Sequence, residues 1–388
     1  MNTKILIFTG KGGVGKSSVA AAHALKSAGN GQKTLLVSTD MAHNLGDMFE
    51  VRLGRDIDNI KPCLDLYEID PQYVMENDFE EIMKYMGSLL GQTGVLGPQD
   101  MGLLPGMEEL FSLLRIAELQ KEGTYERIIV DCAPTGETLS LLKFPELLSW
   151  YMEKLFPIGK VGVRVLAPVS KSLFKLDMPN KHAMNDIEKM YLKLMELEEL
   201  LKNREVTSIR IVTTPEKMVA QETKRNYMYM NLYDFNVDGL YINRILPKDI
   251  GNDFFNEWIG IQQKYIDELK ATFAALPIYE IPWYDEELKG EDNLRRITDD
   301  VLTDDKVFMT RVITQREHFE QTDTGYSLTV HMPGADKKEI DMYQVSGDIV
   351  IKTGNFKRNI PLPNILRTYV VAGAKFEDGM LRINFEAE

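Results

Sequence analysis

Short apolar runs alternate with amphipathic stretches from the N-terminus to about residue 300, and this alternation limits the possible folds most strongly. The runs are continuously apolar, as expected for parallel strands that are buried on both faces. The predicted strands are Lys4–Thr9, Thr34–Thr39, Arg127–Asp131, Ser208–Thr213, Gly239–Asn243 and Ile278–Ile281. The predicted helices are Val19–Ser27, Phe79–Leu90, Glu108–Gln120 and Met184–Leu201. Residues 1–308 are therefore expected to form an α/β unit, a doubly wound and mostly parallel sheet.

The pattern changes after about residue 315, where short strands are separated by turn residues such as Pro333-Gly334 and Asp378-Gly379. The predicted strands are Tyr326–His331, Asp348–Lys352, Phe356–Pro361, Tyr369–Ala372 and Met380–Phe385. This pattern predicts a linker over 309–318 and a small all-β sandwich over 319–388.

Composition excludes several classes of function. The formal net charge of −14 repels nucleic acid and anionic lipid, so no nucleic-acid partner is expected. No window approaches the roughly 18 apolar residues that span a membrane, and the first ten residues carry no cleavage pattern. With only two cysteines, a disulfide scaffold is not expected either. We expect a cytoplasmic protein.

A glycine-rich segment after the first predicted strand satisfies the pattern G-x-x-x-x-G-K-[ST]. In such a loop, backbone N–H groups and the following helix N-terminus surround the phosphates of a nucleotide. Lys16 is expected to contact the β- and γ-phosphates, and the Ser17 hydroxyl to bind Mg²⁺. ATP and Mg²⁺ are thus the expected ligands. The residues of the loop are Gly10, Lys11, Gly12, Gly13, Val14, Gly15, Lys16, Ser17 and Ser18.

The first lysine of this loop adds a resemblance. The segment K-G-G-V-G-K-S resembles the deviant Walker A motif of the SIMIBI class of P-loop NTPases. In that class the first lysine contacts the nucleotide of a partner subunit. The resemblance implies that the chain is a homodimer in which Lys11 acts as a cation in trans.

Four further segments resemble the family of arsenite-pump ATPases, which includes the targeting factors for tail-anchored membrane proteins. They are Asp40–Asp47, Asp131–Leu139, the stretch with Thr214-Pro215-Glu216 and Glu222-Thr223, and Asn243. The resemblance implies that Asp40 orients or deprotonates the attacking water. The alternative role for Asp40 is to cap the N-terminus of the next segment. Asp131 would hold the Mg²⁺ shell. Glu216 and Asn243 would contact the ribose and the base, and residues after Ile281-Pro282-Trp283 would close over the adenine.

The sequence departs from the family pattern at Met41, in place of a proline, and at Glu137, in place of a histidine. Either change is expected to alter turnover or its coupling to the switch segments. The C-x-x-C pair that clamps zinc across the targeting-factor dimer is absent, so no zinc is expected. Cys63 and Cys132 are far apart in sequence, which disfavours arsenite sensing by clustered thiolates, and Cys132 is expected to be a core residue.

Two insertions are predicted, about 72–122 and 145–203, and both are rich in methionine. Met75, Met83, Met86, Met101 and Met107 are in the first, and Met178, Met184, Met190 and Met195 in the second. Core packing explains such residues, but flexible apolar side chains also suit a groove for hydrophobic helices. In the related targeting factors the corresponding insertions form such a groove.

The C-terminal segment A-x-F-x-D-G-x-L, at Ala374–Leu381, resembles the α-crystallin domain of small heat-shock proteins. The free N-terminal arm and the I-x-I/V extension of those proteins are missing, so cage assembly is not expected. The domain is expected either to dock on the ATPase or to shield clients.

The leading interpretation is a nucleotide-gated homodimeric ATPase that captures or targets hydrophobic, membrane-protein-like clients. The alternative is the soluble catalytic subunit of a pump for arsenite or another anion. Septum-positioning, plasmid-partitioning and iron–sulfur carrier ATPases of the same class fit less well, because their own signatures are missing.

Overall fold

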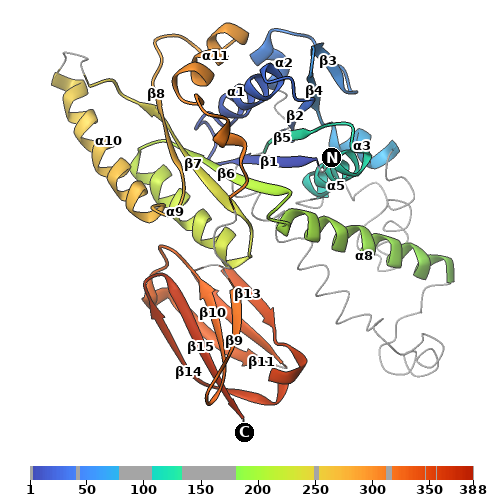
Figure 1. The fold of residues 1–388 in the computed structure, drawn as a ribbon, viewed down its shortest axis with the longest axis vertical. Coiled ribbons are helices and arrows are strands. Elements are labelled where there is room, and N and C mark those ends of the chain that lie inside the picture. Colours follow the sequence, from blue (N-terminus) through green and yellow to red (C-terminus); the bar gives the residue numbers. More distant parts are fainter. Residues whose placement is uncertain are drawn as a thin grey trace, which may run out of the picture.

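The computed structural model describes residues 3–40, 44–77, 107–132, 181–248, 253–311, 317–345, 347–354 and 356–387. It contains one large sheet with helices on both faces and, at the C-terminal end of the chain, a β-sandwich (Figure 1). The predicted helix Phe79–Leu90 and most of the two predicted insertions are outside the described residues.

Eight strands form the large sheet in the order β3-β4-β2-β5-β1-β6-β7-β8. Neighbouring strands are parallel except for β3, which is antiparallel to β4. The mostly parallel, doubly wound sheet expected from the sequence is thereby confirmed. The strands are β1 (Lys4–Thr9), β2 (Thr34–Ser38), β3 (Asp58–Lys61), β4 (Leu64–Glu68), β5 (Arg127–Asp131), β6 (Thr207–Thr213), β7 (Val237–Ile245) and β8 (Ile278–Pro282).

Helices cover the two faces of this sheet because each central strand is apolar on both sides. In β1, Ile5 and Ile7 pack into one core, whereas Leu6 and Phe8 pack into the other. The first core is covered by α3 (Pro71–Asn77), α5 (Met107–Glu122), α8 (Lys181–Lys202), α9 (Lys217–Leu232) and α10 (Asp253–Thr272). The second is covered by α1 (Lys16–Gly29), α2 (Asn44–Phe49), α11 (Glu291–Asp300) and the 3₁₀ turn Asp305–Phe308.

All six strands predicted for this sheet are present, and their ends differ from the prediction by no more than two residues. Within the described residues the sequence prediction was incomplete. It omitted the hairpin β3–β4, the short helices α2 and α3, and the helices α9, α10 and α11. In the predicted stripe on α8, Leu194, Leu197 and Leu201 are buried, so this part of the stripe belongs to the core.

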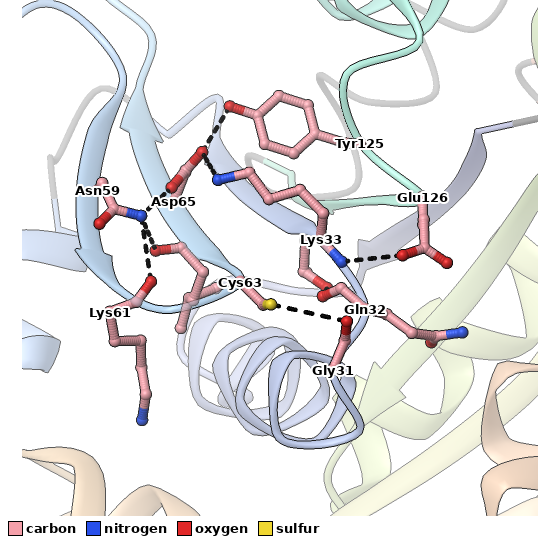
Figure 2. A network of polar contacts seen from close by, with 11 residues as sticks. Gly31, Gln32, Lys33, Asn59, Lys61, Cys63, Asp65, Tyr125 and Glu126 are labelled. Carbon is pink, nitrogen blue, oxygen red and sulfur yellow. Dashed lines mark hydrogen bonds and ion pairs between the residues drawn. The ribbon is translucent and has the colours of Figure 1, made fainter. Parts of the chain in front are cut away.

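A polar network fixes the hairpin β3–β4 at the edge of the sheet where the parallel strands begin (Figure 2). The buried carboxylate of Asp65 accepts hydrogen bonds from Asn59, from the Lys33 ammonium at 2.6 Å and from the Tyr125 hydroxyl at 2.8 Å. Burial alone raises the pKa of Asp65, but these donors outweigh it and hold the pKa below its ordinary value. The ionised carboxylate is thus the stable form within the folded protein.

The C-terminal sandwich consists of two antiparallel sheets, in the orders β14-β15-β10-β9 and β11-β12-β13. The five predicted strands are confirmed, and β9 and β11 were not predicted. The strands are β9 (Glu317–Thr322), β10 (Gly325–His331), β11 (Ile340–Val345), β12 (Asp348–Thr353), β13 (Phe356–Pro361), β14 (Tyr369–Glu377) and β15 (Met380–Ala387); single 3₁₀ turns are Lys337–Glu339 and Asn364–Thr368.

The sandwich docks on the last turns of α9, which β13 and β10 meet directly (Figure 1). The ring of Phe356 stacks on Tyr229 with centroids 3.4 Å apart. The buried Arg358 guanidinium donates to the carbonyl oxygen of Leu232 and forms an ion pair with Glu317 at 2.6 Å. Since the carbonyls of the last helical turn have no partner inside the helix, the Arg358 contact also caps α9. Docking on the ATPase in cis, one of the two roles expected for this domain, is observed.

We predict that Phe356→Ala loosens the docked sandwich by removing the stacked ring. The free energy of unfolding should fall by about 2–4 kcal/mol, as for other truncations of packed aromatic rings. Hydrogen exchange at the end of α9 should become faster. Tyr369→Ala is the matched control, because Tyr369 packs on Tyr326 within the sandwich. Unchanged exchange at Leu232 and Tyr233 in Phe356→Ala would contradict this description of the interface.

We predict that Asp65→Asn destabilises the protein by about 1–3 kcal/mol at neutral pH, the usual effect of removing one partner from a buried hydrogen-bonded group. The pKa of Asp65 is depressed in the folded state, so its contribution is complete above the unfolded pKa of about 3.9. It is lost as the pH falls through the lower folded value. The stability difference between wild type and variant, from denaturant titrations, should therefore shrink below pH 4. Asp56→Asn, an exposed substitution nearby, should show neither effect.

Candidate functional site

The glycine-rich loop lies against the sheet so closely that two of its residues have to be glycine. A Cβ atom on Gly10 would lie 2.1 Å from the carbonyl oxygen of Val212 in β6. Gly15 has φ +92°, and its Cβ would lie 2.3 Å from the Asn243 amide nitrogen. That amide donates a 2.8 Å hydrogen bond to the carbonyl of Val14. The loop is therefore fixed from behind by β6 and β7.

Both lysines of the loop contact groups of their own chain. Lys16, the first residue of α1, is buried, and its ammonium donates to the Lys11 carbonyl oxygen at 3.4 Å. The Lys11 ammonium forms an ion pair with Glu222 of α9 at 3.1 Å. Gly12 and Gly13 are exposed between them. The loop thus has the form expected of a phosphate cradle, with a helix N-terminus behind it.

Asp131 ends β5 at the carboxyl edge of the sheet. It pairs with Phe8 of β1 on one side and with Ser38 of β2 on the other, so its side chain lies beside the loop. Burial is the main cause that raises its pKa to about 6; the Ser17 hydroxyl and Lys16 oppose the rise, and the nearby carboxylate of Asp40 adds to it. The structure therefore brings Asp40, Asp131 and Ser17 together.

The residues around Asp131 fit a divalent cation. Asp131 is 1% exposed, and its Oδ1 has no hydrogen-bond partner in the described structure. A buried carboxylate oxygen without a partner is costly, and Mg²⁺ prefers oxygen ligands of this kind. Ser17 supplies a hydroxyl at the same place. Asp131 and Ser17 are the candidate Mg²⁺ ligands, and Asp40, half-buried next to them, remains accessible to water.

A cavity of about 510 Å³ adjoins the loop on the side of β7 and β8. Its lining includes Ser18 and Asn243, together with the segment from Pro282 to Leu288. The structure thus brings the segment expected to close over the base next to the loop. Both polar atoms of the Asn243 amide are already engaged, since its oxygen accepts from the backbone N–H of Arg244 at 2.9 Å. Asn243 is placed to position the loop, and its predicted contact with the base stays a prediction.

Glu216 lies at the N-terminus of α9, exposed, and its carboxylate accepts from the Thr214 hydroxyl at 3.1 Å. Its predicted contact with ribose stays a prediction too. Met41 and Glu137 lie outside the described residues. Sequence reasoning missed two features of the site. The first is the ion pair between Lys11 and Glu222, which are far apart in sequence. The second is the left-handed backbone of Arg244, with φ 60°, because this conformation is usually predicted from a glycine or an asparagine and the position holds an arginine.

The two cysteines are at opposite ends of the parallel strands. Cys63 precedes β4, whose first residue pairs with Thr34, whereas Cys132 follows β5, whose last residue pairs with Ser38. The length of β2 separates them, roughly 13–20 Å at the usual rise per strand residue. They cannot bind one ion together within a subunit. Cys132 is buried, as expected for a core residue.

A search of the described helices found none with the length and apolar character needed to cross a membrane.

Comparisons with known proteins agree along the whole chain. Residues 3–303 match a family described as anion-transporting ATPase, and residues 323–385 match an HSP20-like domain found in ArsA. A relative from Aquifex aeolicus, provisionally named arsenical pump-driving ATPase 1, is 32% identical over 96% of this chain and 98% of its own length. A provisionally named arsenical pump-driving ATPase from Chlorobaculum tepidum is 35% identical over 99% and 96%. ATPase get3 from Pyrenophora tritici-repentis is 29% identical over 75% and 88%.

We predict that Asp131→Asn stabilises the nucleotide-free protein while abolishing its Mg²⁺-dependent activity. The raised pKa means that ionisation of this buried carboxyl, as the pH rises through about 6, costs folding free energy. Removing the charge should therefore raise the free energy of unfolding by about 2–3 kcal/mol at pH 8, because the folded pKa of about 6 lies well above the ordinary value of an aspartate. At pH 4 the carboxyl is already protonated in the folded protein, so the gain should be small. Denaturant titrations at the two pH values measure this. Mg-ATP should stabilise wild type but not the variant. A variant less stable than wild type at pH 8 would contradict the assignment.

Proposed function

Because the chain belongs to the anion-transporting ATPase family and is an ATPase, we propose that two copies of it enclose ATP and Mg²⁺ between them. ATP binding closes the pair, and hydrolysis opens it. We further propose that this cycle drives capture or targeting of hydrophobic, membrane-protein-like clients.

The observation that carries the dimer proposal is the position of Lys11, the first lysine of the phosphate loop. Lys16 is buried beside Asp131 and serves the nucleotide of its own subunit. The Lys11 side chain is 38% exposed and pairs with α9 at the surface. A cation in this position is placed to leave its subunit and stabilise negative charge that develops on the partner's triphosphate.

The proposed chemistry assigns one task to each group around the γ-phosphate. Loop backbone N–H groups from Gly10 to Ser18 and the N-terminus of α1 bind the phosphates. Mg²⁺, when bound by Ser17 and Asp131, neutralises charge on the phosphate oxygens. Asp40 orients the attacking water and accepts its proton. Glu216 and Asn243, with the segment after Pro282, hold the nucleoside.

The position of the sandwich is compatible with such a dimer. It docks at the C-terminal end of α9, whereas Glu222 near the other end of the helix contacts the loop. Glu222 lies seven residues before Tyr229, about 10 Å along the helix axis. The sandwich therefore contacts turns of α9 other than the one that carries Glu222.

Client capture has narrower support. On α8, Leu192 is 53% exposed and Met195 is 37% exposed, although the stripe beside them is buried. The other methionines of the predicted groove, except the buried Met75, lie where side chains are not described. An HSP20-like domain joined to the ATPase is a second feature that suits binding of apolar segments.

The alternative is the catalytic subunit of an arsenite or anion pump. The names of the relatives from Aquifex aeolicus and Chlorobaculum tepidum favour it. The separation of Cys63 and Cys132 opposes a pump activated by thiolates that share one arsenite within a subunit.

We predict that Asp40→Asn lowers turnover by about 10²- to 10⁴-fold, the usual contribution of a general base, and leaves ATP binding within a few-fold of wild type. Sedimentation of this variant should show a monomer without nucleotide and a dimer with Mg-ATP. Asp56→Asn, an exposed change ahead of β3 and outside these motifs, should behave as wild type. A monomer at saturating Mg-ATP would refute the homodimer.

A second measurement separates client handling from pumping. ATPase activity is recorded with arsenite, with antimonite and with a solubilised apolar helical peptide. We expect the peptide to bind in a nucleotide-dependent way and arsenite to leave turnover within twofold of the basal rate. Stimulation of turnover by arsenite, with no nucleotide-dependent peptide binding, would favour the pump.

A further inference from the structure

The ion pair between Lys11 and Glu222 holds the loop lysine inside its own subunit. The Nζ–Oε2 distance is 3.1 Å, and the two side chains are 38% and 28% exposed. Lys11 is thus directed toward α9. The ammonium of the neighbouring Lys16 contacts the backbone carbonyl of Lys11. The ammonium groups of Lys11 and Lys16 therefore have different partners, the carboxylate of Glu222 and this carbonyl.

Glu222 is held firmly, because α9 is anchored along its whole length. The hydroxyl of the next residue, Thr223, is 2.8 Å from the Thr213 hydroxyl at the end of β6. Lys224 pairs with Glu268 of α10 at 2.8 Å, and the ring of Tyr227 stacks on that of Phe273, the residue after α10, with the two ring centroids 4.3 Å apart. The sandwich fixes the last turns. The backbone of Glu222 therefore stays with its own subunit if the lysine moves toward a second one.

One ammonium group cannot serve both positions. To stabilise charge on a partner's triphosphate, Lys11 has to approach phosphate oxygens to hydrogen-bond distance, about 3 Å. The ion pair between Lys11 and Glu222 would then break. Partly exposed ion pairs are weak enough for such an exchange, and a triphosphate offers more negative charge than one carboxylate.

We propose that Glu222 is a positioning residue that keeps Lys11 in cis until nucleotide and a second subunit together displace it. The proposal rests on the homodimer proposed above. Without ATP, the latch gives Lys11 a partner in its own chain and disfavours association of empty subunits. With ATP, release of the lysine is part of the cost of closing the dimer.

The first test measures association. In an Asp40→Asn background, which preserves ATP, the dimer dissociation constant is measured by sedimentation with and without Glu222→Gln. Breaking one exposed ion pair changes an equilibrium constant by about two- to fivefold. Two lysines are released when a dimer forms, so the dissociation constant should fall roughly 4- to 25-fold in Glu222→Gln. Glu268→Gln, which removes the corresponding pair with Lys224, is the matched control and should leave it unchanged.

The effect has to act through Lys11. In a Lys11→Met background, Glu222→Gln should no longer tighten the dimer. In the hydrolytically active protein, Glu222→Gln should lower the protein concentration that gives half-maximal turnover rather than raise the maximum. A dimer weakened by Glu222→Gln, or tightened equally with Lys11 absent, would overturn the latch.

A second readout does not depend on dimerisation. The rate at which acetic anhydride modifies the Lys11 amine, followed by mass spectrometry in the nucleotide-free protein, should rise in Glu222→Gln and stay unchanged in Glu268→Gln. An unchanged rate in Glu222→Gln overturns the latch directly. A raised rate in a protein that stays monomeric with ATP would confirm the ion pair and refute the homodimer, so the two failures are distinguishable.

Discussion

The close approach of the phosphate loop to the carboxyl edge of the sheet is the constraint on which the site depends. Gly10 rests on the carbonyl of Val212, and Gly15 rests on the amide of Asn243, with no room for a side chain at either position. This contact sets where α1 begins, and therefore where Lys16 and Ser17 lie relative to Asp131. The order of the strands then places β1 between β5 and β6, so that one edge collects the loop, the buried carboxylate and Asp40.

Several groups at the site have a charge and a position that suit a bound Mg-nucleotide. Asp131 keeps a buried oxygen without a partner. Lys16 contacts a backbone carbonyl, and Lys11 contacts Glu222. Each of these groups carries a charge suited to a cation or a phosphate. In this view the fold gives up some stability in order to keep the site ready for its ligands. The helix α9 connects this site to the docked sandwich and gives Glu222 its fixed position.

Much of this could be predicted from the sequence, because short motifs followed strands that were easy to recognise. The glycine spacing of residues 10–18 indicated a loop between β1 and α1, where the structure has it. Asp131 as a cation ligand stays a prediction. The helices α9 and α10 were missed. Buried polar residues such as Asn226 and Asn231 interrupt the apolar period of α9. The hairpin β3–β4 was missed for a related reason, since Asp65 is buried only because distant donors surround it. Contacts between remote residues, such as Phe356 with Tyr229, leave no local signal.

The central claim is that each subunit lends Lys11 to the other, and mixing two inactive variants tests it most directly. Lys11→Met retains Asp40, and Asp40→Asn retains Lys11. In a mixed dimer one site combines Asp40 of the first variant with Lys11 of the second. Random mixing in equal amounts would therefore restore about a quarter of wild-type turnover if the lysine acts in trans, as a catalytic cation supplied by a partner does. If the lysine acts within its own subunit, no site in the mixture is complete, and turnover that stays at the level of the separate variants would contradict the account.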